Sequence, residues 1–125
     1  MKAGIVAGRV LMSLIFIGAG LEKIGGWRHT AEMMAAKGLP VVPVLLALTI
    51  LLEVGGGLAL LTGIRARLGA LALCLFLIPA TYVFHNFWAV AGAEHQLQMV
   101  NFMKNLAIMG GLLVVASSRG SGEDG

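Results

Sequence analysis

Four long apolar stretches divide the chain, from about Ala3 to Leu21, Val41 to Ile64, Leu68 to Ala91 and Leu97 to Ala116. An α-helix needs roughly 20 apolar residues to cross the hydrocarbon of a bilayer, whereas a transmembrane β-strand needs about half as many, with alternating polarity. Each stretch therefore predicts one membrane-spanning α-helix. The pattern as a whole predicts an all-α integral membrane four-helix bundle.

The connections between these stretches differ in character. Residues 22–42 form the longest polar segment, in which Thr30 is a candidate cap for a short helix that ends before Gly38. Its Trp27 favours a position at the membrane surface, so we expect a short interfacial helix between the first two spans. A basic turn holds Arg65 and Arg67, and residues 92–97 are expected to form a loop.

The two ends of the chain are predicted to behave differently. Arg9 interrupts the first apolar run, and no small-residue cleavage site follows it, so we expect this segment to remain as the first span rather than act as a signal peptide. Residues 117–125 are rich in Gly and Ser and are expected to be a disordered polar tail. The sequence thus predicts one transmembrane domain, residues 1–116, followed by that tail.

Composition supports the membrane interpretation. Of the 125 residues, 58% are hydrophobic and 12% are charged, and the mean hydropathy is +0.92. In a soluble domain, about a quarter of the residues are charged. The nine Lys and Arg are scattered, which argues against a nucleic-acid partner. The positive-inside rule, applied mainly to the turn with Arg65 and Arg67, favours both termini on the inner side.

Each predicted span carries one stripe of polar and small residues at intervals of three or four, which places them on one helix face. Such a stripe is typical of helices that pack together with lipid outside. The stripes are Arg9, Ser13, Phe16, Gly20, Lys23 and Trp27; Thr49, Glu53, Gly56 or Gly57 and Leu60; Cys74, Ile78, Thr81, His85 and Trp88; and Asn101, Lys104, Asn105, Ile108 and Gly111.

Ionisable residues within spans are expensive and normally find partners inside the protein. From their estimated depths, we expect a buried polar network of Arg9 and Glu53, extended by Lys104 or Asn105. Such a network can also serve only to fix the orientation of the helices, without any chemistry. Both interpretations stay open at the level of the sequence.

A second group of polar residues is expected near the outer end of the helices. Lys23, His85, Trp88 and Lys104, with Asn105 beside them, are candidates to hold the carbonyl head of a quinone. Histidine can also exchange protons near neutral pH. The alternative is that these side chains only anchor the helices at the membrane surface.

Cysteine and histidine usage limits the redox and metal chemistry of the chain. Cys74 is the only cysteine, so the chain holds no Cys-x-x-Cys redox pair, and the residue is expected to be a small packing residue. The three histidines match no metal-ligand spacing, and no metal site is predicted. The run Gly55-Gly56-Gly57 lies within an apolar helix and predicts close helix packing.

Several short motifs, in this order and spacing, resemble the DoxX family of small four-helix membrane proteins. They cover roughly residues 4–116 and comprise Gly8-Arg9 with Phe16, Gly20 and Lys23; Gly38-Leu39-Pro40; Glu53 with Gly56 and Gly57; His85-Asn86-Phe87-Trp88; and Asn101 to Asn105 with Gly110-Gly111.

The resemblance implies a multi-pass protein of the bacterial inner membrane. It further implies a relation to the small membrane subunit of thiosulfate:quinone oxidoreductase, and to members linked with thiol redox. Shared fold does not fix chemistry, so the resemblance supports the architecture more than the reaction.

Three functions are consistent with the sequence. The first is a membrane subunit of a quinone-linked or thiol-redox oxidoreductase system that has no redox centre of its own and receives electrons from a soluble partner. The second is a non-catalytic scaffold or assembly factor for a redox partner, recruited by residues 22–42. The third is a transporter of a small solute, for which four helices enclose little space unless copies assemble. The small-residue faces would permit a homo-oligomer.

Overall fold

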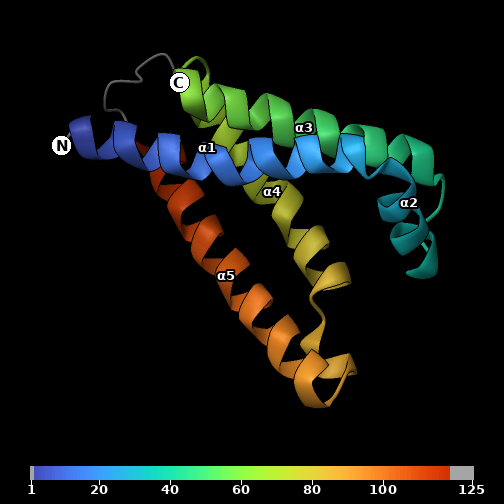
Figure 1. Ribbon diagram of the computed structural model, residues 1–125. Coiled ribbons are helices and arrows are strands. Elements are labelled where there is room, and N and C mark those ends of the chain that lie inside the picture. The colour runs from blue at the N-terminus through green and yellow to red at the C-terminus, as the bar shows by residue number, and fades with distance from the viewer. Residues whose placement is uncertain (1, 119–125) are drawn as a thin grey trace.

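A computed structural model describes residues 2–118 as a chain of helices (Figure 1). The four longest helices are long and apolar enough to cross a membrane, which confirms the predicted all-α fold with four spans. Residues 119–125 of the predicted tail lie outside the described residues. The elements are α1 (Lys2–Gly25), α2 (Trp27–Ala36), α3 (Val42–Thr62), α4 (Ala66–Phe84), the 3₁₀ helix η1 (Phe87–Ala89) and α5 (Gly92–Ser117).

The connections differ from the sequence prediction at two places. The short helix α2 begins at Trp27 rather than at Thr30, with Gly26 before it and no side-chain cap. The predicted loop over residues 92–97 is wrong, because α5 already begins at Gly92 and carries Glu94 in its first turn. A carboxylate in the first turn interacts favourably with the helix dipole, so the polar residues that suggested a loop are compatible with a helix start.

The helices form two pairs that meet at one end and diverge at the other (Figure 1). Helices α1 and α3 lie side by side and run in opposite directions, and α2 folds back beside their far end. Helices α4 and α5 form the second pair and spread away from the first toward η1. The bundle is therefore closed at the end with the α3–α4 turn and open at the end with α2 and η1.

Small residues allow the close approach of the first three spans. A Cβ atom added to Gly57 would lie 2.6 Å from the side chain of Ile17 and 3.2 Å from its backbone nitrogen. A Cβ on Gly56 would lie within 2.6–3.0 Å of the side chain of Leu73 on α4. By contrast, a Cβ on Gly55 would meet nothing within 4 Å. Two of the three glycines thus lie at helix contacts, as predicted for close packing.

A hydrophobic core occupies the closed end, where the two helix pairs meet. Arg67 on α4 donates from Nε to the backbone oxygen of Ala116 at 3.0 Å, which ties the start of α4 to the end of α5. Many large apolar side chains on the outer faces are exposed, as expected where lipid covers them. The core consists of Phe16, Leu60, Ala70, Leu73, Cys74, Leu77, Leu112 and Val115.

The predicted orientation can be tested with single cysteines that leave every charge in place. Ile64, in the α3–α4 turn, is 69% exposed, and Ala93 is exposed at the start of α5. With both termini inside, a membrane-impermeant maleimide should label Ala93→Cys in right-side-out vesicles and Ile64→Cys only in inverted ones. Cys74 is buried and provides the unlabelled background. The reverse labelling pattern would show the opposite orientation.

Candidate functional site

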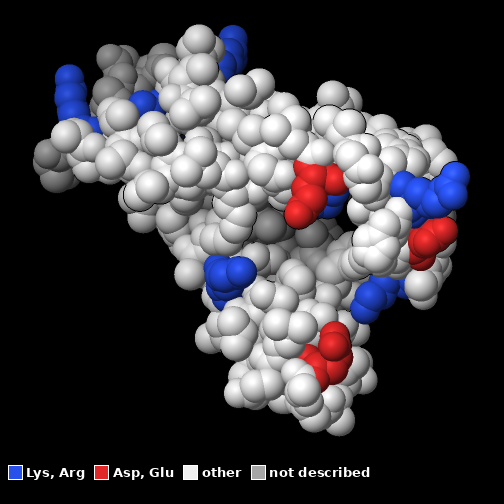
Figure 2. Space-filling view, in the orientation of Figure 1, with Lys and Arg blue, Asp and Glu red and all other residues white. Residues whose placement is uncertain are grey.

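A cavity of about 800 Å³ lies between the two helix pairs and is lined by residues from all five α-helices. Figure 2 shows the corresponding hollow in the surface, with charged side chains near its edges and largely uncharged surface around them. Most of the lining side chains are apolar, with a small number of polar ones among them. Ligand pockets commonly combine these two properties.

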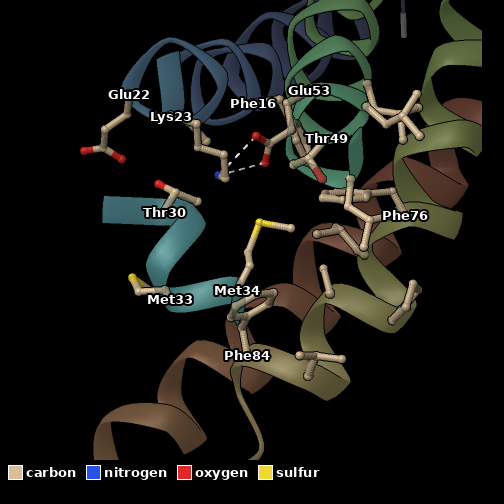
Figure 3. Close-up of a pocket in the computed structure, with 18 of the residues that line it drawn as sticks. Phe16, Glu22, Lys23, Thr30, Met33, Met34, Thr49, Glu53, Phe76 and Phe84 are labelled. Carbon is tan, nitrogen blue, oxygen red and sulfur yellow. Dashed lines mark hydrogen bonds and ion pairs between the residues drawn. The ribbon is translucent and has the colours of Figure 1, made fainter. Parts of the chain in front are cut away.

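The main charged feature of the cavity wall is an ion pair between Lys23 on α1 and Glu53 on α3 (Figure 3). The Lys23 Nζ lies 3.1 Å from Oε1 of Glu53 and donates a hydrogen bond to Oε2 at 3.3 Å. The Glu53 side chain is 7% exposed, whereas that of Lys23 is 27% exposed. The carboxylate is therefore the more deeply buried partner, and the ammonium group stabilises its charge.

The antiparallel register of α1 and α3 brings this pair together. Gly20 of α1 packs against Val54 of α3, so the residues one turn further along α1 lie beside Glu53. Lys23 is the basic residue in the last turn of α1, which continues to Gly25. A basic side chain near a helix C-terminus is also favourable in the field of the helix dipole.

The predicted pairing of Arg9 with Glu53 does not occur. Arg9 is buried, but its guanidinium packs against Gly63, at the C-terminal end of α3. Ten residues separate Gly63 from Glu53, which corresponds to roughly 15 Å along a helix. Arg9 and Glu53 are thus both interior residues, as predicted, but they lie at different depths. Lys104 is exposed on α5 and is not part of a network with Glu53.

Helix α2 and helix α4 provide the opposite walls of the cavity. Met34 is buried and extends from α2 into the space below the ion pair (Figure 3). Phe84 and Phe76 come from α4 and face the same space, while Thr49 lies beside Glu53 on α3 (Figure 3). The short helix predicted as a surface element thus forms part of the wall of the cavity.

Two further predicted site residues, His85 and Asn105, also line the cavity. His85 directly follows α4, and its Nδ1 lies 2.8 Å from Oε1 of Gln98 on α5. Asn105 donates from Nδ2 to the hydroxyl oxygen of Thr81 at 3.0 Å, which joins α5 to α4. The structure therefore brings Lys23, His85 and Asn105 to the wall of one cavity.

Trp88 and Lys104, the other two predicted residues, are not among the residues that line the cavity. Trp88 is 51% exposed, and its ring packs against those of Tyr82, Phe87 and Phe102 at centroid distances of 5.2–5.9 Å. A half-exposed aromatic cluster at the end of a span is typical of an anchor at the membrane surface. The surroundings of Trp88 therefore fit an anchor at the membrane surface better than a role in holding a ligand.

Sequence reasoning missed Met34, Phe84 and Gln98. The two apolar residues carry no signal, because Met and Phe are common at any position of a membrane helix. Gln98 lies four residues after Glu94, and its amide donates to Oε2 of Glu94 at 2.9 Å. A polar pair at this spacing, with one member in the predicted loop and the other just inside the predicted span, was the available signal that the helix begins earlier. Between residues 2 and 118 no group of three or more metal-ligating side chains comes together.

Comparison with known proteins gives a consistent picture. The DoxX family model matches residues 4–86. The inner membrane protein YqjF of Escherichia coli (strain K12) is 41% identical over 113 residues, which cover 90% of this chain and 82% of YqjF. The inner membrane protein YphA of the same organism is 28% identical over 108 residues, which cover 86% of this chain and 77% of YphA. No solved structure matches the chain. Together with the four spans, these relatives confirm the predicted multi-pass inner-membrane location.

Proposed function

The chain belongs to the DoxX family, and from this premise we propose that it binds an amphiphilic, quinone-type molecule in the cavity as the membrane subunit of a redox system. The observation that carries the proposal is the cavity itself, which lies between spanning helices and combines apolar walls with a few fixed polar groups.

The size and position of the cavity support a lipid-like ligand. A volume of about 800 Å³ lies within the usual range for sites that bury a small organic molecule. The helices on both sides are long and apolar enough to cross a membrane, so a lipid-soluble molecule in the bilayer would have direct access to the space between them. The isoprenoid tail of a quinone would contact the apolar walls without leaving a hydrocarbon environment.

The polar side chains would orient the head of such a molecule. The Lys23 ammonium carries three N–H donors and uses them only in part for Glu53. It can therefore donate to a ligand carbonyl, while Glu53 holds it in place. His85 and Asn105 add polar groups from the other helix pair. A ligand that contacts Lys23 together with His85 or Asn105 would bridge the two pairs of helices.

Electron transfer in this proposal needs a partner. A bound quinone would supply the redox chemistry, and a soluble protein would supply or accept the electrons at the membrane surface. The residues of the chain bind and orient the ligand and exclude water from it. This assignment also gives α2 a role, because the short helix forms part of the cavity wall.

Ligand binding can be tested directly. The protein purified in mild detergent should yield a near-stoichiometric quinone on solvent extraction, detected by ultraviolet absorbance and mass spectrometry, and should bind an added short-chain quinone. Ala80 lines the cavity, so Ala80→Phe is expected to fill part of it and weaken binding of the short-chain quinone by roughly tenfold or more, because overpacking opposes the ligand.

A substitution on the outer face of the same helix provides the matched control. Leu75 on α4 is 58% exposed, and Leu75→Phe should leave quinone binding unchanged. Absence of an extracted quinone together with no binding of the added analogue would contradict the proposal. It would favour a non-catalytic scaffold, in which the ion pair only orients the helices.

A further inference from the structure

Three side chains connect the cavity to the N-terminal end of α5 through hydrogen bonds. His85 lines the cavity, and its Nδ1 lies 2.8 Å from Oε1 of Gln98. Gln98 in turn donates from Nε2 to Oε2 of Glu94 at 2.9 Å. Glu94 is exposed in the first turn of α5, and Gln98 lies one turn further along the same helix face. The direction of both hydrogen bonds in this row follows from the Glu94 carboxylate at its far end.

The carboxylate of Glu94 only accepts hydrogen bonds, so the amide group of Gln98 must face it with its NH₂. The carbonyl oxygen of Gln98 then faces His85, and this oxygen also only accepts. The Nδ1 of His85 must therefore carry a proton. A neutral imidazole has only one N–H group, so its Nε2 is left as an acceptor. Within residues 2–118, no hydrogen bond engages this Nε2.

We propose that Gln98 holds His85 in the Nδ1–H tautomer, so that the cavity presents a hydrogen-bond acceptor and prefers a ligand head that carries a hydroxyl group. Resting on the proposed function, this inference names the reduced, hydroquinone form of the ligand as the preferred one. A hydroquinone hydroxyl donates to Nε2, whereas the carbonyl of the oxidised form meets a second acceptor and cannot. An acceptor left unpaired by the wrong ligand weakens binding by roughly tenfold.

His95 offers a matched comparison within the same chain. Its Nδ1 lies 2.8 Å from the backbone oxygen of Phe87 and 3.2 Å from that of Val90. Backbone carbonyls only accept, so His95 is held in the same tautomer as His85. His95 is not among the residues that line the cavity. His95 therefore serves as an internal reference for the Nδ1–H form at a position outside the ligand site.

The tautomer can be measured without any ligand. Protein labelled with ¹⁵N-histidine, in detergent at pH 8, should show both His85 and His95 as Nδ1–H in two-bond proton–nitrogen correlation spectra. Gln98→Met keeps the side-chain length but removes the amide, so His85 should shift toward the Nε2–H form while His95 stays unchanged. Finding His85 as Nε2–H in the unaltered protein would overturn the inference.

Binding provides the second test. Under anaerobic conditions, a short-chain hydroquinone should bind the unaltered protein about tenfold more tightly than its quinone. Gln98→Met should abolish this preference, and His95→Gln should keep it. Equal binding of both forms to the unaltered protein would refute this inference and leave the proposed function standing. Absence of binding by either form, with His85 as Nδ1–H, would refute the proposed function and the ligand preference that rests on it, and would leave only the tautomer assignment standing.

Discussion

Replacing Lys23 with methionine is expected to lower the free energy of unfolding by about 3 kcal/mol, because it leaves the buried carboxylate of Glu53 without its counter-ion. Removal of the other partner, by Glu53→Leu, should lower the free energy of unfolding by only about 1 kcal/mol. The Lys23 side chain is 27% exposed and can extend toward the membrane surface. Thermal unfolding in detergent, followed by circular dichroism, measures both changes.

The double variant Lys23→Met/Glu53→Leu separates stability from ligand binding. Apolar residues of similar volume often replace a buried ion pair without loss of stability, so this variant should unfold close to the unaltered protein. It should nevertheless bind short-chain quinone more weakly, because the donor has gone. Lys104→Met, at an exposed position of α5, is the control and should change stability by less than about 0.5 kcal/mol. Equal losses of stability in Lys23→Met and Glu53→Leu would contradict the expected difference between these two variants.

The spans and their inward faces could be predicted from the sequence because hydropathy and helical periodicity act locally. The buried residues of α1 are Arg9, Ser13, Phe16 and Gly20, all of which belong to the predicted stripe. The fourth span was predicted less well, because a stripe on one helix does not show how far its neighbours cover it. Lys104 on that stripe is exposed, whereas Leu112 further along is buried.

The pairing within the site could not be predicted in the same way. Which residue of α1 faces Glu53 depends on the vertical register of two helices, and this register follows from helix ends and glycine contacts rather than from periodicity. Depth estimates favoured Arg9, but the packing of Gly20 against Val54 selects Lys23. The spreading of the two helix pairs has no signal in the sequence either, and it is this spreading that leaves room for the cavity.

A second glycine contact between α1 and α3, at Gly57, leads to the second large expected effect. Gly57→Val should lower the free energy of unfolding by about 3 kcal/mol, because its Cβ would lie 3.2 Å from the backbone nitrogen of Ile17 and overpacking against backbone cannot be relieved by a rotamer change. Separation of α1 from α3 would also move Lys23 away from Glu53, so quinone binding should fall with stability.

Gly55→Val introduces the same side chain into the same helix, two residues earlier. The added Cβ meets nothing within 4 Å, so its effect should stay within about 0.5 kcal/mol. Because the intrinsic helix propensities of the two variants are identical, the difference in their melting temperatures measures the helix contact alone. A Gly57→Val protein that melts at the same temperature as Gly55→Val would show that α1 and α3 do not pack through Gly57, and the register that pairs Lys23 with Glu53 would lose one of its two glycine contacts.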